Sequence, residues 1–421
     1  MDFEIKRNVL IKYNGNDANV SIPDGVSKIG DRAFEDCKSL KTVTIPDSVK
    51  SIGYNAFAEC ESLESVTIPD SVTDVGWCVF YGCKSLKTIT IPASVRRIEI
   101  RLFQNCESLE SIAIPNRVTT IREGAFYGCE SLKSITIPDS VKNIGSKAFA
   151  DCKSLETVTI PESVAEISKD IFSGCISLKS LQLPKRYSVT LNESFLIVDD
   201  IIWVYKGQDS SVLIPHGVRG IDKSVFAGCK SLKTVTIPDG VSRIGIAAFR
   251  DCESLESVTI PDGVTMIEYE TFDLCTSLKS VMIPASVWRI GSKAFRDCES
   301  LESVTIPKGV EYIEDYAFVD CKSLKTVTIP DSVSEIGEGA FRGCESLESV
   351  TIPDSVTKIG EKAFCDCKSL KTVTIPERVK DIDEGTFDGC ESLETVTITR
   401  SKTSSVDKAF KNCPKPKIIR K

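Results

Sequence analysis

Hydrophobic and polar positions repeat along almost the whole chain with a period of 23 residues. Residues 29–49 read IGDRAFEDCKSLKTVTIPDSV, and nearly the same string returns many times. Leu40, Val43 and Ile45 form the apolar set of a β-branched segment, which predicts a short strand with one buried face. The next three residues, Pro-Asp-Ser at 46–48, predict a turn, because Pro fixes its own φ and Asp and Ser can hydrogen-bond their own backbone. Each repeat is therefore expected to hold a strand, a turn and a short return segment.

Three landmark residue types keep this period. Phe recurs from Phe34 to Phe172 and again from Phe226 to Phe410; Cys follows three residues after each Phe, and Leu follows three residues after nearly every Cys. Leucine at fixed offsets in such a period is the signature of a leucine-rich-repeat solenoid, whose stacked units place equivalent side chains in columns. We expect an α/β solenoid: a curved right-handed superhelix with a parallel sheet on its concave face. The Ala-Phe-x-x-Cys segment is too short for an ordinary helix, so 3₁₀ or helical turns and loops are expected on the convex side.

Two segments interrupt the repeats and resemble each other. Residues 1–22 predict a capping hairpin and a first strand, because Asn14-Gly15 between apolar runs is a strong turn signal. Residues 195–215 match residues 3–23 position for position, which indicates an internal duplication offset by 192 residues. The expected organisation is listed by range: cap 1–22, first repeat module 23–184, hairpin insertion 185–214, second repeat module 215–398, degenerate C-terminal cap 399–421. We expect the second hairpin to pack on the edge of a continuous stack.

Eighteen cysteines could indicate disulfides or zinc in a chain of this length. Sixteen of them occupy the same repeat position, so their Cβ vectors should be parallel and not convergent, which disfavours a bridge. We interpret them as buried free thiols that act as small hydrophobes. Cys78 and Cys365 lie outside the column and are interpreted as incidental; the pair formed by Cys365 and Cys367 lacks the further ligands that zinc needs.

The residue after the repeat leucine alternates in charge throughout. The first module has Lys41, Glu64, Lys87, Glu110, Lys133, Glu156 and Lys179, and the second module continues the alternation. In a parallel stack these side chains would lie above one another, so alternation pairs opposite charges. An exposed pair contributes only about 0.2–1 kcal/mol. We therefore hypothesise that the charge ladder mainly discourages the near-identical repeats from slipping by an odd number of units.

Composition and motifs offer little support for catalysis or a cofactor. The net charge is −8, and no Lys/Arg-rich stripe precedes the last few residues, which disfavours a nucleic-acid partner. No apolar run is long enough to span a membrane, and the N-terminal sequence lacks the pattern of a secretory signal. The single histidine, His216, replaces the Asp of a repeat turn, and no phosphate-binding or calcium-binding loop is present. We expect no catalytic residue, no cofactor and no metal site.

The exposed strand face is predicted to carry regular columns of Lys/Glu, Thr/Ser and Thr. The Thr column beginning at Thr44 is interrupted at Ala113, Gln182, Leu213 and Met282. Gln182, Leu213 and Met282 are candidates for a less polar partner-binding patch near the centre of the chain. The alternative interpretation, sequence drift at the duplication junction, remains open.

The unit IG-x-x-AF-x-x-C-x-SL-x-x-VTIP-[DE]-[SG]-V resembles the BspA-like, or Treponema-type, class of leucine-rich repeats, and the resemblance covers almost the whole chain. The resemblance implies a cell-surface or secreted protein that binds host, matrix or microbial surface proteins, and it carries no catalytic residues. We therefore expect a non-enzymatic, adhesin-like, monomeric protein-binding scaffold that uses its concave face. Two alternatives remain: an intracellular interaction scaffold, consistent with free thiols and the missing export signal, or the repeat region of a larger anchored protein or enzyme.

Overall fold

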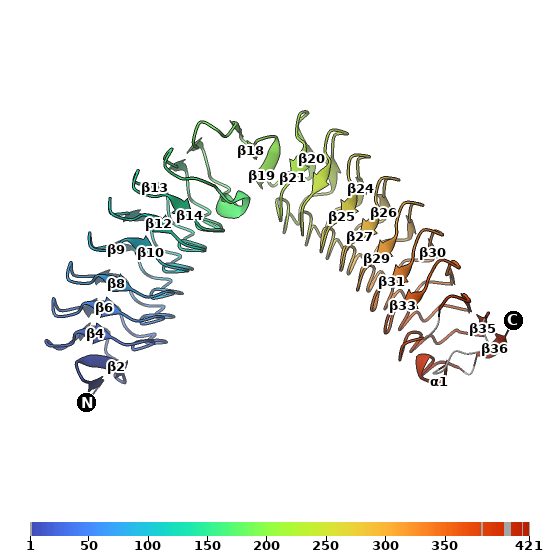
Figure 1. The fold of residues 1–421 in the computed structure, drawn as a ribbon, viewed down its shortest axis with the longest axis horizontal. Coiled ribbons are helices and arrows are strands. Elements are labelled where there is room, and N and C mark those ends of the chain that lie inside the picture. Colours follow the sequence, from blue (N-terminus) through green and yellow to red (C-terminus); the bar gives the residue numbers. More distant parts are fainter. Residues whose placement is uncertain (1, 380–381, 400–405, 415, 421) are drawn as a thin grey trace. The chain divides into compact units, whose positions relative to one another are not determined.

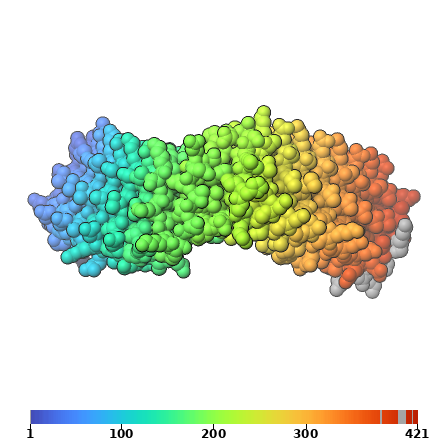
Figure 2. Space-filling view, turned by 90° about the horizontal axis from the view of Figure 1, so that it is seen from above, coloured from blue at the N-terminus to red at the C-terminus, as the bar shows by residue number. Residues whose placement is uncertain are grey.

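The computed structural model describes residues 2–379, 382–399, 406–414 and 416–420. The chain divides into two compact units: unit 1 holds Met1–Asp199 and Trp203–Gly207, and unit 2 holds Asp200–Ile202 and Gln208–Lys421. Within each unit, short similar coils follow one another along the stack (Figure 1). In the space-filling view, the sequence colours succeed one another within each unit, as expected for coils that contact mainly their neighbours in the chain (Figure 2).

In most coils a first strand begins two residues after the repeat leucine. Its middle residue is buried and its flanking residues are mostly exposed, as in Thr42-Val43-Thr44, and neighbouring first strands pair in parallel, as Val43 does with Val66. The first strands of unit 1 are β3 (Asn19–Ser21), β5 (Thr42–Thr44), β7 (Ser65–Thr67), β9 (Thr88–Thr90), β11 (Ser111–Ala113), β13 (Ser134–Thr136), β15 (Thr157–Thr159) and β16 (Ser180–Gln182). Those of unit 2 form one ten-stranded sheet: β20 (Ser211–Leu213), β22 (Thr234–Thr236), β24 (Ser257–Thr259), β26 (Ser280–Met282), β28 (Ser303–Thr305), β30 (Thr326–Thr328), β32 (Ser349–Thr351), β34 (Thr372–Ile375), β35 (Thr395–Ile398) and β36 (Lys417–Arg420). The predicted parallel-sheet solenoid is confirmed, whereas the curvature expected of it stays a prediction.

A second strand, only two residues long, follows the turn in most coils. The sequence predicted Ile52 only as an inward-pointing residue, but Ser51 and Ile52 form a strand that pairs in parallel with Asp74 and Val75. The second strands of unit 1 are β4 (Lys28–Ile29), β6 (Ser51–Ile52), β8 (Asp74–Val75), β10 (Arg97–Ile98), β12 (Thr120–Ile121) and β14 (Asn143–Ile144). Those of unit 2 are β21 (Gly220–Ile221), β23 (Arg243–Ile244), β25 (Met266–Ile267), β27 (Arg289–Ile290), β29 (Tyr312–Ile313), β31 (Glu335–Ile336) and β33 (Lys358–Ile359).

The Phe-containing side of the coil is built from hydrogen-bonded turns. The expected 3₁₀ helix occurs in one described coil, η1 (Lys169–Phe172), and the described α-helix is α1 (Val406–Ala409). Elsewhere every second backbone N–H group donates a hydrogen bond to the next coil, and the others donate within their own coil. The Phe34 N–H donates to the Ala56 carbonyl of the next coil at 2.8 Å, whereas the Cys37 N–H donates to the Phe34 carbonyl. Because half of the donors serve the neighbouring coil, the segment cannot close regular helical turns. The prediction of helical turns is therefore wrong for most described coils.

The core consists of stacked columns. The rings of Phe226 and Phe249 are parallel within 2°, with centroids 5.0 Å apart. Beside them, the Cys60 thiol donates to the Phe34 carbonyl of the preceding coil at 3.0 Å, and the same bond recurs through most of the column. All eighteen cysteines are free, and thirteen of the sixteen in the column are buried, which confirms the predicted thiol column. Cysteine suits this position because it is small and apolar yet has a weak donor for a buried carbonyl.

The N-terminal hairpin closes the aromatic column of unit 1. β1 (Phe3–Lys6) and β2 (Val9–Tyr13) are antiparallel, and β2 then pairs in parallel with β4. The Tyr13 ring lies between those of Phe3 and Phe34, with both centroid distances at 5.2 Å. Beyond the repeats of unit 1, β17 (Val189–Leu191) pairs antiparallel with β18 (Phe195–Val198). In the strand β19 (Ile201–Tyr205), Ile201 and Ile202 pair with the second strand β21.

Candidate binding surfaces

The first-strand face is the exposed surface of the first strands. Leu213 and Met282 are 67% and 68% exposed there, the largest exposures among the exposed large hydrophobic side chains of the described residues. Leu213 pairs with Thr236, and Thr259 pairs with Met282, so both belong to one column with two threonines between them. Three strand spacings place them about 14 Å apart, which is too far for contact.

The third predicted patch residue, Gln182, lies in β16 of unit 1. It pairs with Thr159, whose hydroxyl is 3.5 Å from the Gln182 side-chain oxygen. The structure thus places all three candidates on exposed positions of first strands but does not gather them into one cluster. The partner-binding role of Gln182, Leu213 and Met282 stays a prediction.

Unit 1 has a shallow hollow of about 610 Å³ on its first-strand face. Threonine and serine side chains of β7, β9, β11 and β13 line it, together with Ala113. Ala113 is one of the positions where the Thr column is interrupted, so a missing hydroxyl and methyl group contribute to the depression. The hollow is open to solvent and is not an enclosed site.

The Lys/Glu ladder runs along the same face. Its ion pairs join neighbouring coils: Lys41–Glu64 at 3.8 Å, Lys179–Glu156 at 2.9 Å, Lys279–Glu256 at 3.4 Å, Lys325–Glu302 at 3.4 Å and Lys371–Glu348 at 3.6 Å. All of these side chains are about half exposed or more, so each pair contributes little to stability. The hypothesis that the ladder prevents slippage stays a prediction.

A second charged column was missed by the sequence analysis. It lies directly after the repeat cysteine, and its pairs are Lys84–Glu61 at 3.3 Å, Lys153–Glu130 at 2.6 Å, Lys230–Glu253 at 2.7 Å, Lys322–Glu299 at 2.7 Å and Lys368–Glu345 at 2.9 Å. The signal was present in the sequence, because many repeats read either CKSLK or CESLE. Opposite charges therefore pair in a second column as well, although Glu107 and Glu130 interrupt its alternation.

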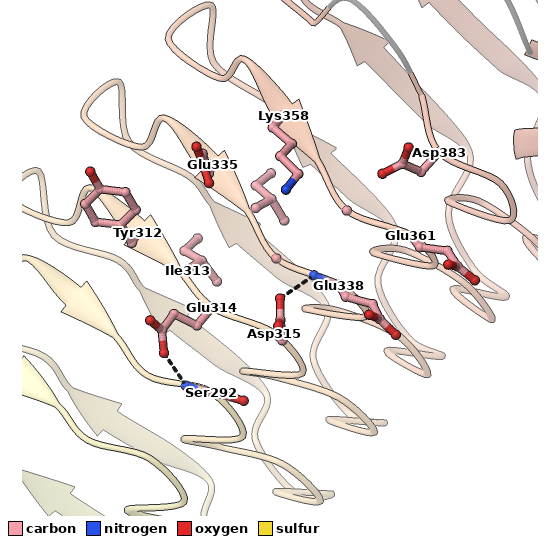
Figure 3. A pocket seen from close by; sticks show the side chains of 13 residues that line it. Ser292, Tyr312, Ile313, Glu314, Asp315, Glu335, Glu338, Lys358, Glu361 and Asp383 are labelled. Carbon is pink, nitrogen blue, oxygen red and sulfur yellow. Dashed lines mark hydrogen bonds between the residues drawn. The ribbon is translucent and has the colours of Figure 1, made fainter.

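The second-strand face of unit 2 carries an acidic groove of about 510 Å³ (Figure 3). We define the acidic groove by its charged and aromatic lining residues: Tyr312, Glu314, Asp315, Glu335, Glu338, Lys358, Glu361 and Asp383. Gly337 and Gly360 also line it. A Cβ at Gly337 would lie 2.5 Å from the Asp315 backbone nitrogen, so glycine is needed there for the coils to approach each other.

Some of these carboxylates have partners within the protein. Glu314 accepts hydrogen bonds from Arg289 at 2.7 Å and from the Ser292 N–H at 2.9 Å, and Asp315 accepts the Glu338 N–H at 2.8 Å (Figure 3). Asp315, Glu335, Glu338, Glu361 and Asp383 are nevertheless exposed. The acidic groove therefore offers carboxylate oxygens to solvent.

A groove on the second-strand face of unit 1 carries more arginines than carboxylates. A groove of about 500 Å³ along β8 and β10 is lined by Arg96, Arg97 and Arg117, together with Asp74 and Glu99. Two arginines already share one carboxylate, because Arg97 lies 3.1 Å and Arg122 2.9 Å from Glu99. This arginine groove is consequently closer to neutral than the acidic groove of unit 2.

One buried charge cluster distinguishes a single coil of unit 2. Asp273 is fully buried, and Arg296 donates two hydrogen bonds to its carboxylate at 2.6 and 2.7 Å. Arg250, from the preceding coil, lies 3.6 Å from Asp273 and 3.4 Å from Glu270. The hydrogen bonds to Asp273 raise the pKa of Arg296. The cluster is enclosed by its own partners, and we interpret it as structural.

The described residues contain no group of three or more His, Cys, Asp or Glu side chains that could hold a metal ion. His216 is exposed in its turn. Burial raises the pKa of thiols such as Cys83 and Cys298, which disfavours the nucleophilic thiolate. Among the described residues, no helix has the length and apolar character needed to span a membrane.

Comparison with known proteins shows a family match over almost the whole chain. A family model for the BspA type leucine rich repeat region matches residues 5–130, 98–201, 204–322 and 288–417. A leucine-rich repeat protein from Eubacterium ventriosum is 21% identical, with a TM-score of 0.59 and coverage of 93% of both chains, and this likeness shows the fold. No curated protein matches the chain.

Two further solved structures align over most of their length. A leucine-rich repeat protein from Bacteroides ovatus is 29% identical over 94% of this chain and 98% of its own, with a TM-score of 0.47. A protein from Faecalibacterium prausnitzii, described as a leucine rich cell surface protein, is 26% identical over 97% of this chain and 95% of its own, with a TM-score of 0.41.

Proposed function

The chain belongs to the BspA-type leucine-rich-repeat family, and from this premise we propose that it is a non-enzymatic scaffold that binds a protein partner through its first-strand face. The observation that carries this proposal is the face itself. Parallel first strands present an ordered array of threonine, lysine and glutamate side chains, interrupted in unit 2 by the protruding Leu213 and Met282. Repeat stacks commonly use such extended surfaces for binding.

Leu213 and Met282 support this assignment because an isolated exposed apolar side chain can anchor a partner. Such anchors contribute most when the partner covers them and excludes water. The threonines between them offer hydroxyl groups for hydrogen bonds without long side chains that must be immobilised. A polar face with a few apolar anchors suits a protein partner better than a small molecule, which usually needs a concave apolar site.

We place this scaffold at the cell surface or outside the cell as an adhesin-like module. Family membership supports this location. Fractionation of the producing cell tests it. Recovery in the cytosolic fraction would replace it with the intracellular scaffold considered in the sequence analysis.

The binding proposal is tested by affinity capture from lysate and from a panel of matrix proteins. The variant with Gln182→Thr, Leu213→Thr and Met282→Thr restores the regular threonine column and should lose the partner of the wild-type protein. A matched control places three changes on the same column, Thr136→Ser, Thr305→Ser and Thr328→Ser, and should retain that partner. Equal recovery of every partner by the wild type and the triple threonine variant would eliminate the role of these residues.

A further inference from the structure

We propose that the acidic groove of unit 2 binds an extended, Lys/Arg-rich segment of a protein partner. The acidic groove lies on the second-strand face, whereas the function proposed above uses the first-strand face. The two proposals rest on different residues, so either can fail without the other.

The net charge of the acidic groove identifies a cationic occupant. Six carboxylates and one lysine line it, and although Glu314 pairs with Arg289 and Glu361 with Lys362, the groove keeps an excess of negative charge. The groove runs across β29, β31 and β33, so its charged side chains come from successive coils (Figure 3). Such a field attracts a cationic segment and sets the orientation in which it docks.

The arrangement of these carboxylates differs from that of the Lys/Glu ladder. In the Lys/Glu ladder, opposite charges follow each other from coil to coil. Asp315, Glu338 and Glu361 instead occupy one repeat position in three successive coils, so like charges lie on neighbouring coils. Like charges stacked directly opposite destabilise a sheet. A cationic segment bound along this column would relieve that repulsion.

Two aromatic side chains border the acidic groove and can also bind cations. Tyr312 lines the groove and contacts Trp288 edge-to-face, with ring centroids 6.1 Å apart. Both rings are 39% exposed. A guanidinium or ammonium group over such a ring gains about 0.5–1 kcal/mol at an exposed site. The same surface therefore combines carboxylates with an exposed ring, a combination that favours Arg and Lys side chains.

The spacing of the coils fits an extended segment. From the coil of Tyr312 to the coil of Asp383 there are three steps of about 4.8 Å, or roughly 14 Å. An extended chain advances about 3.3 Å per residue, so four or five residues cover this length and two or three side chains face the groove. Basic residues at every second position of the segment would place their charged side chains toward the acidic groove.

Two other occupants fit less well. A divalent ion needs several oxygen ligands within about 2.6 Å, and the described residues contain no cluster that provides them. A second copy of the chain would have to offer the arginine groove of unit 1, where Arg97 is already paired with Glu99.

The proposal is tested by fluorescence anisotropy of the full chain with a labelled (Arg-Ser)₄ peptide at low salt. A labelled (Glu-Ser)₄ peptide should not bind. The variant Asp315→Asn, Glu338→Gln, Glu361→Gln should weaken (Arg-Ser)₄ binding about tenfold, because three pairings are lost. Tyr312→Leu should weaken it by roughly twofold to fivefold through loss of the ring face.

The control variant removes three carboxylates elsewhere: Asp47→Asn, Asp70→Asn, Asp139→Asn in exposed turns of unit 1. It changes the net charge by the same amount and should bind (Arg-Ser)₄ as the wild type does. Equal weakening by both triple variants would mean non-specific attraction and would overturn the proposal. Circular dichroism checks that each variant is folded. Concentration-dependent self-association that the groove variant abolishes, measured by sedimentation, would assign the acidic groove to a second copy instead.

Discussion

The two units have similar cores and different surfaces. In unit 1 the Phe57 and Phe80 rings are 5.7 Å apart and parallel within 3°, and in unit 2 Phe318 and Phe341 are 5.3 Å apart at the same angle. On the second-strand face, however, the groove along β8 and β10 of unit 1 is lined by three arginines and two carboxylates, whereas the acidic groove of unit 2 is lined by six carboxylates and one lysine. Stacking requires equivalent side chains at buried positions, because each side chain packs against its counterpart in the next coil. Exposed positions in the same coils face no such requirement, so they can differ between units and serve binding.

Alkaline unfolding should affect the feature that both units share. Burial raises the pKa of Cys83 and Cys129 in unit 1 and of Cys298 and Cys321 in unit 2 above the ordinary thiol value of 9.0, and it raises the pKa of Cys229 to about 12. Above pH 9 the unfolded chain releases thiol protons that the folded chain keeps, so folding stability is complete below pH 9 and falls as the pH rises. The expected loss is about 1.4 kcal/mol per pH unit for each buried thiol.

This prediction is checked by urea unfolding at pH 7, 9 and 10 in the presence of a reductant. In the double variant Cys298→Ala, Cys321→Ala the free energy of unfolding should fall less between pH 9 and pH 10, because two thiols no longer release protons on unfolding. Tyrosine and lysine titration are the same in both proteins and cancel in the comparison. An unchanged slope would show that these thiols do not carry the pH dependence.

Truncation within the aromatic column should be the next largest effect. Phe126→Ala in unit 1 and Phe318→Ala in unit 2 each remove a fully buried ring, at a cost of about 3–5 kcal/mol. Hydrogen exchange measured by mass spectrometry should lose protection mainly in the unit that carries the change, because coils interact with their neighbours. Phe→Leu at the same positions should cost less. Equal loss of protection in both units would contradict this local coupling.

Asp273 should distinguish unit 2 from unit 1. Asp273→Asn keeps the shape but removes the charge that Arg296 holds with two hydrogen bonds, so the free energy of unfolding should fall by about 2–3 kcal/mol. Asp388→Asn, at the same repeat position, is the control, because Asp388 is only half buried and accepts one hydrogen bond from Asn412. It should cost less than about 1 kcal/mol. A similar loss in both variants would argue against a special role for burial at Asp273.

The sequence predicts the columns better than it predicts the surfaces between them. Phe, Cys and Leu identify the stack because burial fixes both their type and their spacing. The second strands were missed because a segment such as Ser51-Ile52 is too short to show alternation. Helical turns were predicted wrongly because the alternate N–H groups that bond to the next coil leave no trace in a single repeat. The acidic groove was missed because its carboxylates are confined to a few successive coils, so the repeat position of Asp315 and Glu338 shows no charge pattern along the whole chain.

Backbone strain offers a smaller test across the units. Leu274 has a φ of +60°, and Asn105, which occupies the same repeat position in unit 1, also has a φ of +60°. The left-handed region costs an ordinary residue about 1–2 kcal/mol, and Asn tolerates it better. Leu274→Asn should therefore raise the unfolding free energy by about 0.5–1 kcal/mol, after some loss of contact by the half-buried side chain. The reverse change, Asn105→Leu, should lower it, and thermal unfolding of both variants measures the pair. The same sign for both would refute the strain argument.

The smallest effects should separate the ladder from the acidic groove by their sign. Glu110→Gln in unit 1 and Glu302→Gln in unit 2 each remove a carboxylate that lies between lysines on neighbouring coils, so each should lower stability by about 0.2–1 kcal/mol at low salt. Glu338→Gln, between Asp315 and Glu361, should raise stability by a comparable amount because it relieves like-charge repulsion. All three effects should shrink as salt screens exposed charges. Urea unfolding at two salt concentrations measures them; if Glu338→Gln were destabilising, the carboxylates of the acidic groove would be stabilising one another through the fold, and no external cation would be needed to explain them.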